Sequence, residues 1–458
     1  MIGCFSLARE TFDINFAKKK LLKTKKSLTK LNKKIIFFDD LITNDKIGEN
    51  AIKYFENIKC TKFIVFQSTF TDAKFISSFV KKFKKPLIFI SFKEKRSGGR
   101  LRLNSLCGVN LGLHALIKNK FFSNFIIYTN NEQSFSKEIL KFMRTNNNFT
   151  KKNYLKKINS KLVNKKIIKF KKPKLGLIGE RPEGFDTCDF NNQELKSKFN
   201  ANVTKIKLQS LFNTSSKVNI KKINQTKKNV SKKLKNINQV NQKELNKSIS
   251  LFHGLEKIQQ DLNIDAFAVR CWPEMFTEYG CASCGPMAMM NENKISSACE
   301  ADVLGSLTCN ILNQLNNKPS LLVDIVDVDE KDDTTVFWHC GLAPISMAEK
   351  NTPSATVHSN RRKPLLHNFA FKSGEITIFR VSKSENKLKF IVMNGKVLKR
   401  KNSFSGTSGV ISLGKNTHKK IKNLFLSGLE HHVGFTYGDV LEDIKSLGKQ
   451  LKIPTYTI

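Results

Sequence analysis

The chain has 458 residues, and 40% of them are hydrophobic. A chain of this length is too long to fold around a single hydrophobic core. We therefore expect two or three domains. No apolar run reaches the 18 residues of a membrane-spanning helix, and the start of the chain soon carries Arg9, Glu10 and Asp13, so it makes a poor secretory signal. The ten cysteines lack the density of a disulfide scaffold, and a cytoplasmic protein with reduced thiols is expected.

The formal net charge of +42 is unevenly distributed along the chain. Residues 1–250 hold 55 basic and 17 acidic side chains, whereas residues 251–458 hold 25 and 21. A basic half can bind nucleic acid or another polyanion through phosphate contacts. The same composition is also typical of a coding sequence rich in A and T. We favour the second interpretation because no nucleic-acid-binding motif accompanies the lysines, and we expect neither a specific nucleic acid nor a membrane as a partner.

Residues 1–165 alternate short apolar strands with amphipathic helices. The strands include "KIIFFDD", "KFIVFQS", "PLIFISF" and "FIIYTNN", and "FISSFVKKFKK" has the spacing of a helix. This alternation predicts a parallel sheet covered by helices.

A second α/β unit follows a connector around residues 145–172. It begins with the strand in "PKLGLIG", and its polar stretch 213–250 is expected to be exposed helix. From residue 346 the pattern becomes β-rich, with a hairpin from "EITIFRVS" and "KLKFIVMNGKVL" and a final helix "DVLEDIKSLGKQL". We predict two Rossmann-like α/β domains, residues 1–165 and 166–345, followed by a smaller β-rich C-terminal domain, residues 346–458.

Asp324 interrupts the apolar strand 321–326, where an unpaired carboxylate would cost several kcal/mol. A cation would compensate that burial. Glu300 is expected to open the preceding helix, and His339, His431 and His432 lie farther on. Carboxylates with imidazole bind Mn²⁺, Zn²⁺, Fe²⁺ or Mg²⁺. Each residue also has a simpler explanation, since Glu300 can serve the helix dipole, His339 can be a core residue, and the acids from 327 to 333 can form a solvated turn.

Several long motifs, in order, are similar to the L-fucose isomerase and L-arabinose isomerase family, in its fucose-isomerase-like branch. They are "QSTFTDA", "SGGRLRLNSLCGVNL", "LGLIGERPEGFD", "RCWPEM", "ACEADVLGSLT", "VDIVDVDEKDDTTVFWHCGLAP" and "EHHVGF". The resemblance implies a divalent metal, Mn²⁺ most readily, bound by Glu300, Asp324 and His432, with His339 as a candidate fourth ligand. His432 is preferred to His431 from its distance to the final helix.

The resemblance further implies aldose–ketose isomerisation of a monosaccharide through a cis-enediol, with Glu300 and Asp324 as the catalytic acids. Two acids are required because two protons move. Fucose, a pentose and sulfoquinovose all stay open as the sugar. Six residues are candidate sugar contacts: Arg270, Trp272, Glu274, Asn104, His114 and His431. In this family the active sites form between subunits, so a homo-oligomer is expected in which Asn104 and His114 serve a neighbour. A polyanion-binding protein on an isomerase-derived scaffold is the alternative.

Overall fold

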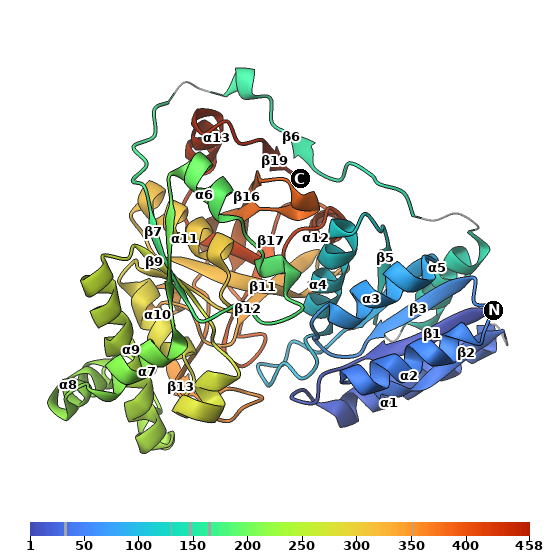
Figure 1. Cartoon of the computed structure of the whole chain (residues 1–458), viewed down its shortest axis with the longest axis horizontal. Helices are drawn as coiled ribbons and strands as arrows, with labels where there is room; N and C mark the ends of the chain where they lie inside the picture. Colours follow the sequence, from blue (N-terminus) through green and yellow to red (C-terminus); the bar gives the residue numbers. More distant parts are fainter. Residues whose placement is uncertain (32–33, 130, 146–148, 164–165, 351) are drawn as a thin grey trace.

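The computed structural model describes residues 1–458 except 32–33, 130, 146–148, 164–165 and 351. In this part of the chain three sheets are present, of five, four and ten strands. The first two are parallel, and the third is mixed, so the predicted α/β class with two parallel sheets and a β-rich C-terminal region is confirmed. Figure 1 shows the five-stranded sheet on the right and the helices of the central region on the left. None of the described helices is both long enough and apolar enough to cross a membrane.

The N-terminal sheet has the strand order β2-β1-β3-β4-β5, the order of flavodoxin-like folds. The helix α4 is buried along most of its length because it contacts β4 of this sheet as well as β11 and α12 of the C-terminal region. The elements are β1 (Ile2–Leu7), α1 (Ile14–Leu31), β2 (Ile35–Ile42), α2 (Asp45–Glu56), β3 (Lys62–Gln67), α3 (Lys74–Phe83), β4 (Leu87–Phe92), α4 (Ser105–Lys118), β5 (Asn124–Tyr128) and α5 (Glu132–Arg144). All four quoted strands are confirmed, and β1, which the sequence analysis did not assign, pairs with both β2 and β3.

The central sheet has the order β10-β9-β7-β8. The polar stretch 213–250 is helical as expected, but it is divided among three helices, and α9 buries one face. The elements are β7 (Lys174–Ile178), α6 (Asn192–Phe199), β8 (Asn202–Ile206), α7 (Leu208–Ser216), α8 (Ile220–Ser231), α9 (Gln242–Leu262), β9 (Ala266–Val269), α10 (Cys284–Glu292), β10 (Ser296–Ala298) and α11 (Val303–Asn316). Glu300 does not open α11, as had been expected, because Asp302 caps that helix and Glu300 lies in the preceding turn.

The large sheet closes on itself, since β16 pairs with β17 as well as with β15. Six antiparallel strands, in the order β17-β12-β11-β18-β15-β16, therefore form a ring, and the predicted hairpin is its β15–β16 pair. The strands are β6 (Lys156–Lys157), β11 (Ser320–Asp329), β12 (Thr334–His339), β13 (Ser354–Thr356), β14 (Leu366–Ala370), β15 (Gly374–Ser382), β16 (Lys389–Leu398), β17 (Thr407–Ser412), β18 (His432–Tyr437) and β19 (Thr455–Thr457), with α12 (Thr417–Leu426) and α13 (Leu441–Gln450) beside them.

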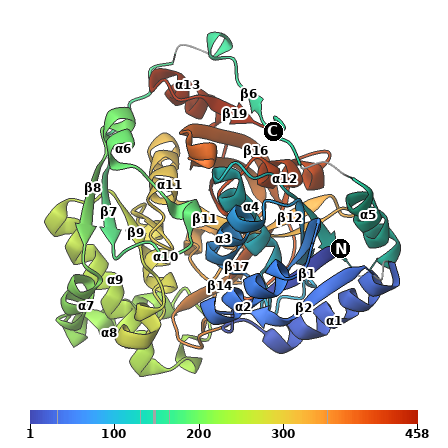
Figure 2. The ribbon, with the colours of Figure 1, turned by 45° about the vertical axis from the view of Figure 1, so that its right-hand side comes forward.

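Strands of the connector and of the central region also enter this large sheet. β11 and β12 precede residue 346, where the third domain was predicted to start. β6 of the connector pairs with β19 at one edge of the sheet. The turned view of Figure 2 shows α4 of the N-terminal region lying beside the strands of the ring. The three regions therefore meet around β11 and β18, where the candidate site lies.

Candidate active site

Neighbouring strands bring Asp324 and His432 together. Asp324 lies on β11 and His432 on β18, and the two are directly opposite each other in the antiparallel register. Side chains at opposite positions of a strand pair share one face of the sheet. Glu300 reaches the same point from the turn after β10, where it adopts a left-handed backbone conformation with φ of 57°. The structure thus gathers three residues that are far apart in the sequence.

The facing atoms of these residues are all acceptors. His432 donates its Nδ1–H to Asp302 Oδ2 at 3.0 Å, so the neutral ring presents a bare Nε2 on its other side. That nitrogen faces Asp324 Oδ1 at 3.5 Å and Glu300 Oε2 at 3.9 Å. Asp324 Oδ1 is buried and has no hydrogen-bond partner among the described residues. Three lone-pair atoms that converge in a buried space repel one another, and a bound cation would remove that repulsion.

Asp302 and Arg380 hold His432 in place. The two side chains form a fully buried bidentate ion pair, with Arg380 Nη1 and Nη2 donating to the carboxylate at 2.7 and 3.0 Å. The charge of Arg380 keeps the pKa of Asp302 well below its usual range despite the burial, which acts in the opposite direction. A carboxylate behind an imidazole fixes the tautomer of a metal-binding histidine. The sequence analysis missed both residues, although Arg380 interrupts the apolar strand β15 just as Asp324 interrupts β11.

Glu300 is oriented through both of its carboxylate oxygens. The Trp272 indole N–H donates to Oε1 at 3.2 Å, and His431 Nε2 lies 2.9 Å from Oε2. Burial would raise the pKa of Glu300, but the hydrogen bond and charge of His431 outweigh it and lower the pKa to about 2. Glu300 in turn raises the pKa of His431. The carboxylate of Glu300 is therefore ionised and rigidly held.

The other two groups of the trio are shifted toward their neutral forms. Burial raises the pKa of Asp324, with a further contribution from the charge of Glu300. Burial and the charge of His431 lower the pKa of His432, which keeps its Nε2 unprotonated at neutral pH. This side of the site can therefore accept a cation without first releasing a proton from the imidazole.

A second set of potential ligand atoms overlaps with the first. Cys188, Glu300, His431 and His432 place one donor atom each within 4.8 Å of one another. Burial raises the pKa of the Cys188 thiol well above its usual value, so the thiolate that a metal requires is disfavoured. His431 is already bonded to Glu300, and Thr187 Oγ1 lies 2.6 Å from its other nitrogen. The trio of Glu300, Asp324 and His432 is the better candidate.

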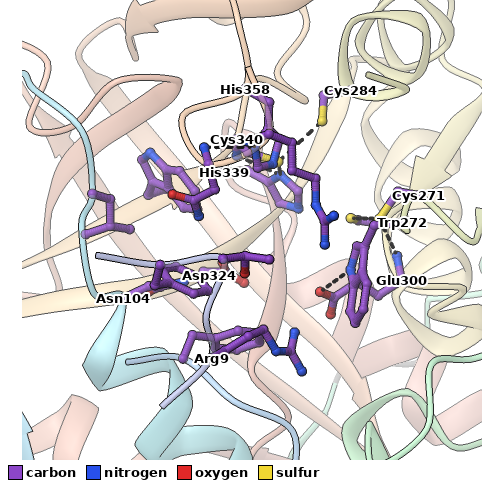
Figure 3. Close-up of a pocket in the computed structure, with 18 of the residues that line it drawn as sticks. Arg9, Asn104, Cys271, Trp272, Cys284, Glu300, Asp324, His339, Cys340 and His358 are labelled. Carbon is purple, nitrogen blue, oxygen red and sulfur yellow. Dashed lines mark hydrogen bonds between the residues drawn. The ribbon is translucent and has the colours of Figure 1, made fainter. Parts of the chain in front are cut away.

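A cavity opens directly in front of the trio and encloses about 760 Å³ of empty space, its mouth included. Figure 3 shows the carboxylate of Glu300 beside the ring of Trp272, with Asp324 and Arg9 to their left, and all four residues line the cavity. Arg9 follows β1, Trp272 follows β9, and Glu300 follows β10. The carboxyl ends of strands in two parallel sheets thus form one crevice with the ring, as is typical of ligand sites in open α/β sheets.

Besides Glu300, Asp324 and His432, three further predicted sugar or metal contacts line this cavity. Asn104 lies there within its own chain, and its buried Oδ1 has no hydrogen-bond partner in the described residues. Trp272 presents its ring, and His339 lies 6.0 Å from the His432 ring, centroid to centroid. His339 Nδ1 accepts the Cys340 backbone N–H at 2.9 Å, so Nε2 is the ring nitrogen that remains for a ligand.

The remaining predicted contacts lie elsewhere. Arg270 and Glu274 pair with each other at 2.7 Å, and Arg270 lines a neighbouring cavity that shares Arg9 and Trp272 with the first. His114 is buried in α4, with Nδ1 bonded to the Gly428 carbonyl at 2.8 Å. His431 lies behind Glu300, as described. None of these residues lines the first cavity among the described side chains.

A second structural expectation from the sequence, after that for Glu300, is also wrong. The acids from 327 to 333 do not all form a solvated turn, because the side chain of Asp327 is only 4% exposed and accepts Arg96 Nε at 2.7 Å. Burial raises the pKa of Asp327. The first residues of the run therefore belong to β11, and the pair fastens the loop after β4 to the ring.

Comparisons with known proteins identify the relatives of this chain. Residues 3–173 match the N-terminal domain of fucose/sulfoquinovose isomerases, and residues 367–458 match the C-terminal domain of L-fucose isomerase. A sulfoquinovose isomerase of Priestia megaterium is 31% identical over 455 residues, which cover 98% of this chain and 97% of the relative. The chain belongs to the fucose/sulfoquinovose isomerase family. It is a sugar isomerase that interconverts an aldose and a ketose.

Two further sulfoquinovose isomerases cover most of the chain. The enzyme of Alkalicoccus urumqiensis is 30% identical over 398 residues, or 86% of each chain. The enzyme of Clostridium sp. (strain MSTE9) is 26% identical over 450 residues, or 97% of this chain and 96% of the relative. The resemblance found in the sequence motifs is thereby confirmed at the level of the family.

Proposed function

We propose that this isomerase requires a divalent metal, most readily Mn²⁺, and acts on a sulfonated hexose of the sulfoquinovose class. The observation that carries the metal is the buried convergence of His432 Nε2 with oxygens of Asp324 and Glu300, where Asp324 Oδ1 has no hydrogen-bond partner among the described residues. The hard oxygen ligands with one imidazole favour Mn²⁺ or Mg²⁺. The substrate class is supported by the relatives, which are sulfoquinovose isomerases.

The residues of the chain have separable roles in this proposal. Glu300, Asp324 and His432 would hold the ion, with Asp302 and Arg380 fixing the imidazole behind it. A bound dication would polarise the C1 carbonyl and the C2 hydroxyl of an open-chain aldose, which lowers the pKa of the C2 proton.

Two carboxylates face the place where the reacting carbons would lie, and two protons must move. One carboxylate would take the proton from C2 to give a cis-enediol, and return it to C1. The other would carry a proton between the oxygens of C1 and C2. The hydrogen bonds from Trp272 and His431 fix the Glu300 carboxylate, whereas Asp324 Oδ1 has no such restraint among described residues.

Isomerisation after metal removal tests the proposal. The purified enzyme would be treated with EDTA and assayed with sulfoquinovose, L-fucose and D-arabinose, before and after addition of Mn²⁺, Mg²⁺ or Zn²⁺. We expect turnover to disappear with EDTA, to return best with Mn²⁺, and to be greatest with sulfoquinovose. Full activity in EDTA would contradict the metal, and a preference for an uncharged sugar would contradict the substrate class.

Solvent exchange tests the cis-enediol separately. In D₂O the proton removed from C2 exchanges on the carboxylate, so the ketose should carry deuterium at C1 by NMR. A ketose without deuterium would indicate a direct hydride shift between the two carbons, in which neither Glu300 nor Asp324 serves as the base.

A further inference from the structure

Arg361 is a cation of the cavity wall without an anionic partner. It lies in the loop between β13 and β14, and no carboxylate of the described residues lies within ion-pair distance of its guanidinium. Its guanidinium carbon instead lies 5.7 Å from the centre of the Trp272 ring and 5.1 Å from that of Phe276. A partly buried guanidinium that contacts only aromatic faces has paid part of its desolvation cost without gaining a charged partner.

Arg9 approaches the same indole. Its guanidinium carbon lies 4.9 Å from the centre of the Trp272 ring, and its Nη2 is 3.0 Å from Asp72 Oδ2. Arg9 and Arg361 are close enough for their charges to oppose each other, which together with burial lowers the pKa of Arg361. Because Asp72 offsets only one of the two cations, the pair carries a net charge of about +1 on the cavity wall.

The loop that carries Arg361 is held in position before any ligand binds. The backbone N–H groups of Asn360 and Arg361 both donate to His358 Nδ1, at 3.2 and 3.3 Å. The Asn360 side chain accepts two hydrogen bonds from Arg100, at 2.6 and 3.0 Å. Burial and the neighbouring Arg361 lower the pKa of His358 to about 3, so the ring is neutral and its proton resides on Nε2. His358 lines the cavity as well and adds a neutral donor to its wall.

Trp272 connects this cationic wall to the reacting end of the cavity. Its indole N–H donates to Glu300 Oε1 at 3.2 Å, whereas the two guanidinium groups lie near the centre of its rings. A sugar whose first two carbons lie at Glu300 and Asp324 would therefore direct its far end toward Arg361 and Arg9.

We propose that Arg361, with Arg9 and His358, forms the subsite for the terminal anionic group of the substrate, and that this anion is a sulfonate. The proposal rests on the proposed function, because it takes the sugar to lie with C1 and C2 at the carboxylates. A sulfonate carries a single negative charge, which balances the net charge of the two arginines and Asp72. A phosphate, with about two negative charges at neutral pH, would exceed it.

Substrate discrimination by Arg361→Gln tests this subsite. The kcat and KM values would be measured for sulfoquinovose and for 6-deoxy-D-glucose, which has the same carbons without the sulfonate. Loss of one charge-assisted contact should raise KM for sulfoquinovose about 10- to 100-fold, with kcat changed much less. Turnover of 6-deoxy-D-glucose should stay within about threefold. Arg362→Gln is the matched control, because Arg362 is the next residue, is exposed and lies outside the cavity lining.

Three outcomes of this kinetic comparison would contradict the proposed sulfonate subsite. Equal losses on both sugars would show that Arg361 supports the fold or the reacting end, and unchanged kinetics on both would show that it contacts neither. If glucose 6-phosphate is turned over better than sulfoquinovose, and Arg361→Gln removes that preference, the anion is a phosphate.

Calorimetric binding of sulfoquinovose to the EDTA-treated enzyme makes the test independent of catalysis. We expect Arg361→Gln to weaken this binding at least 10-fold and Arg362→Gln to leave it unchanged. If the wild type turns over no aldose yet binds sulfoquinovose through Arg361, the proposed reaction fails and the subsite stands. If the wild type isomerises sulfoquinovose and the Arg361→Gln protein binds it equally well, the subsite fails and the reaction stands.

Discussion

Replacing Asp302 with asparagine should weaken both the metal site and the fold. The side chain keeps its shape, and an asparagine can still cap α11 as Asp302 does through the Gly305 N–H, at 2.8 Å. The asparagine lacks the negative charge of the carboxylate, which pairs with Arg380 and accepts the His432 Nδ1–H. The effects of charge and of helix capping are therefore separated by this substitution.

The magnitude of each effect follows from the surroundings of Asp302. Removing one partner of a buried ion pair costs about 3–5 kcal/mol, and Asp302 and Arg380 side chains are 0% and 1% exposed. Glu430 lies 3.8 Å from Arg380 Nε and retains part of the compensation, so we expect about 3 kcal/mol. Loss of the carboxylate behind a metal-binding histidine typically weakens metal affinity about 10- to 100-fold.

Metal titration and thermal unfolding measure the two effects. Mn²⁺ affinity would be measured by calorimetry on EDTA-treated Asp302→Asn and wild-type protein, and for a chain of 458 residues we expect a loss of about 3 kcal/mol to lower the melting temperature by about 3 °C. Asp261→Asn serves as the control, since Asp261 forms an exposed pair with Lys257 on α9 and should change neither quantity appreciably. A folded Asp302→Asn protein with wild-type Mn²⁺ affinity would refute the role of Asp302 in orienting His432.

Three further predictions concern other parts of the molecule. Gly305→Ala should destabilise the protein and weaken Mn²⁺ binding, because the added Cβ would lie 2.5 Å from Asp302 Oδ2. This steric clash should outweigh the gain in helix propensity of about 1 kcal/mol. Unfolding and metal titrations measure the two effects, and a net stabilisation would contradict the prediction. Arg96→Met should lower the free energy of unfolding by about 3 kcal/mol at pH 7, because it leaves the Asp327 carboxylate buried and unpaired. The loss should be smaller at pH 5, because Asp327, whose pKa is already raised, can take up a proton. A loss that does not depend on pH would exclude this explanation. Burial lowers the pKa of His367 to about 4, and its buried Nε2 has no hydrogen-bond partner among described residues. Between pH 6.5 and pH 4 the unfolded state therefore binds a proton at this histidine that the folded state does not bind. The free energy of unfolding of the wild type should fall by up to about 3 kcal/mol over this range. His367→Gln should remove this part of the pH dependence in urea unfolding, and an identical profile for the two proteins would disprove it.

The sequence by itself determined the classes of element, and its family motifs indicated Glu300, Asp324 and His432 as candidate ligands. Alternating strands and helices predict parallel sheets because the periodicity of apolar residues is a local property of the chain. Asp324 could be singled out because a carboxylate within an apolar strand needs compensation wherever that strand lies. The same reasoning, applied to Arg380 in β15, would have indicated the second charged group of the site.

Only the tertiary structure decided how these side chains meet. The register of β11 against β18 sets His432 opposite Asp324, and a turn with positive φ, which no propensity predicts, carries Glu300 to them. The separation of Arg270 and Glu274 from the cavity, and the approach of Arg9 and Arg361 to one indole, depend on the packing of three sheets against one another. Such contacts join residues that are distant in the chain, and their geometry is set by the shape of the whole core rather than by local sequence.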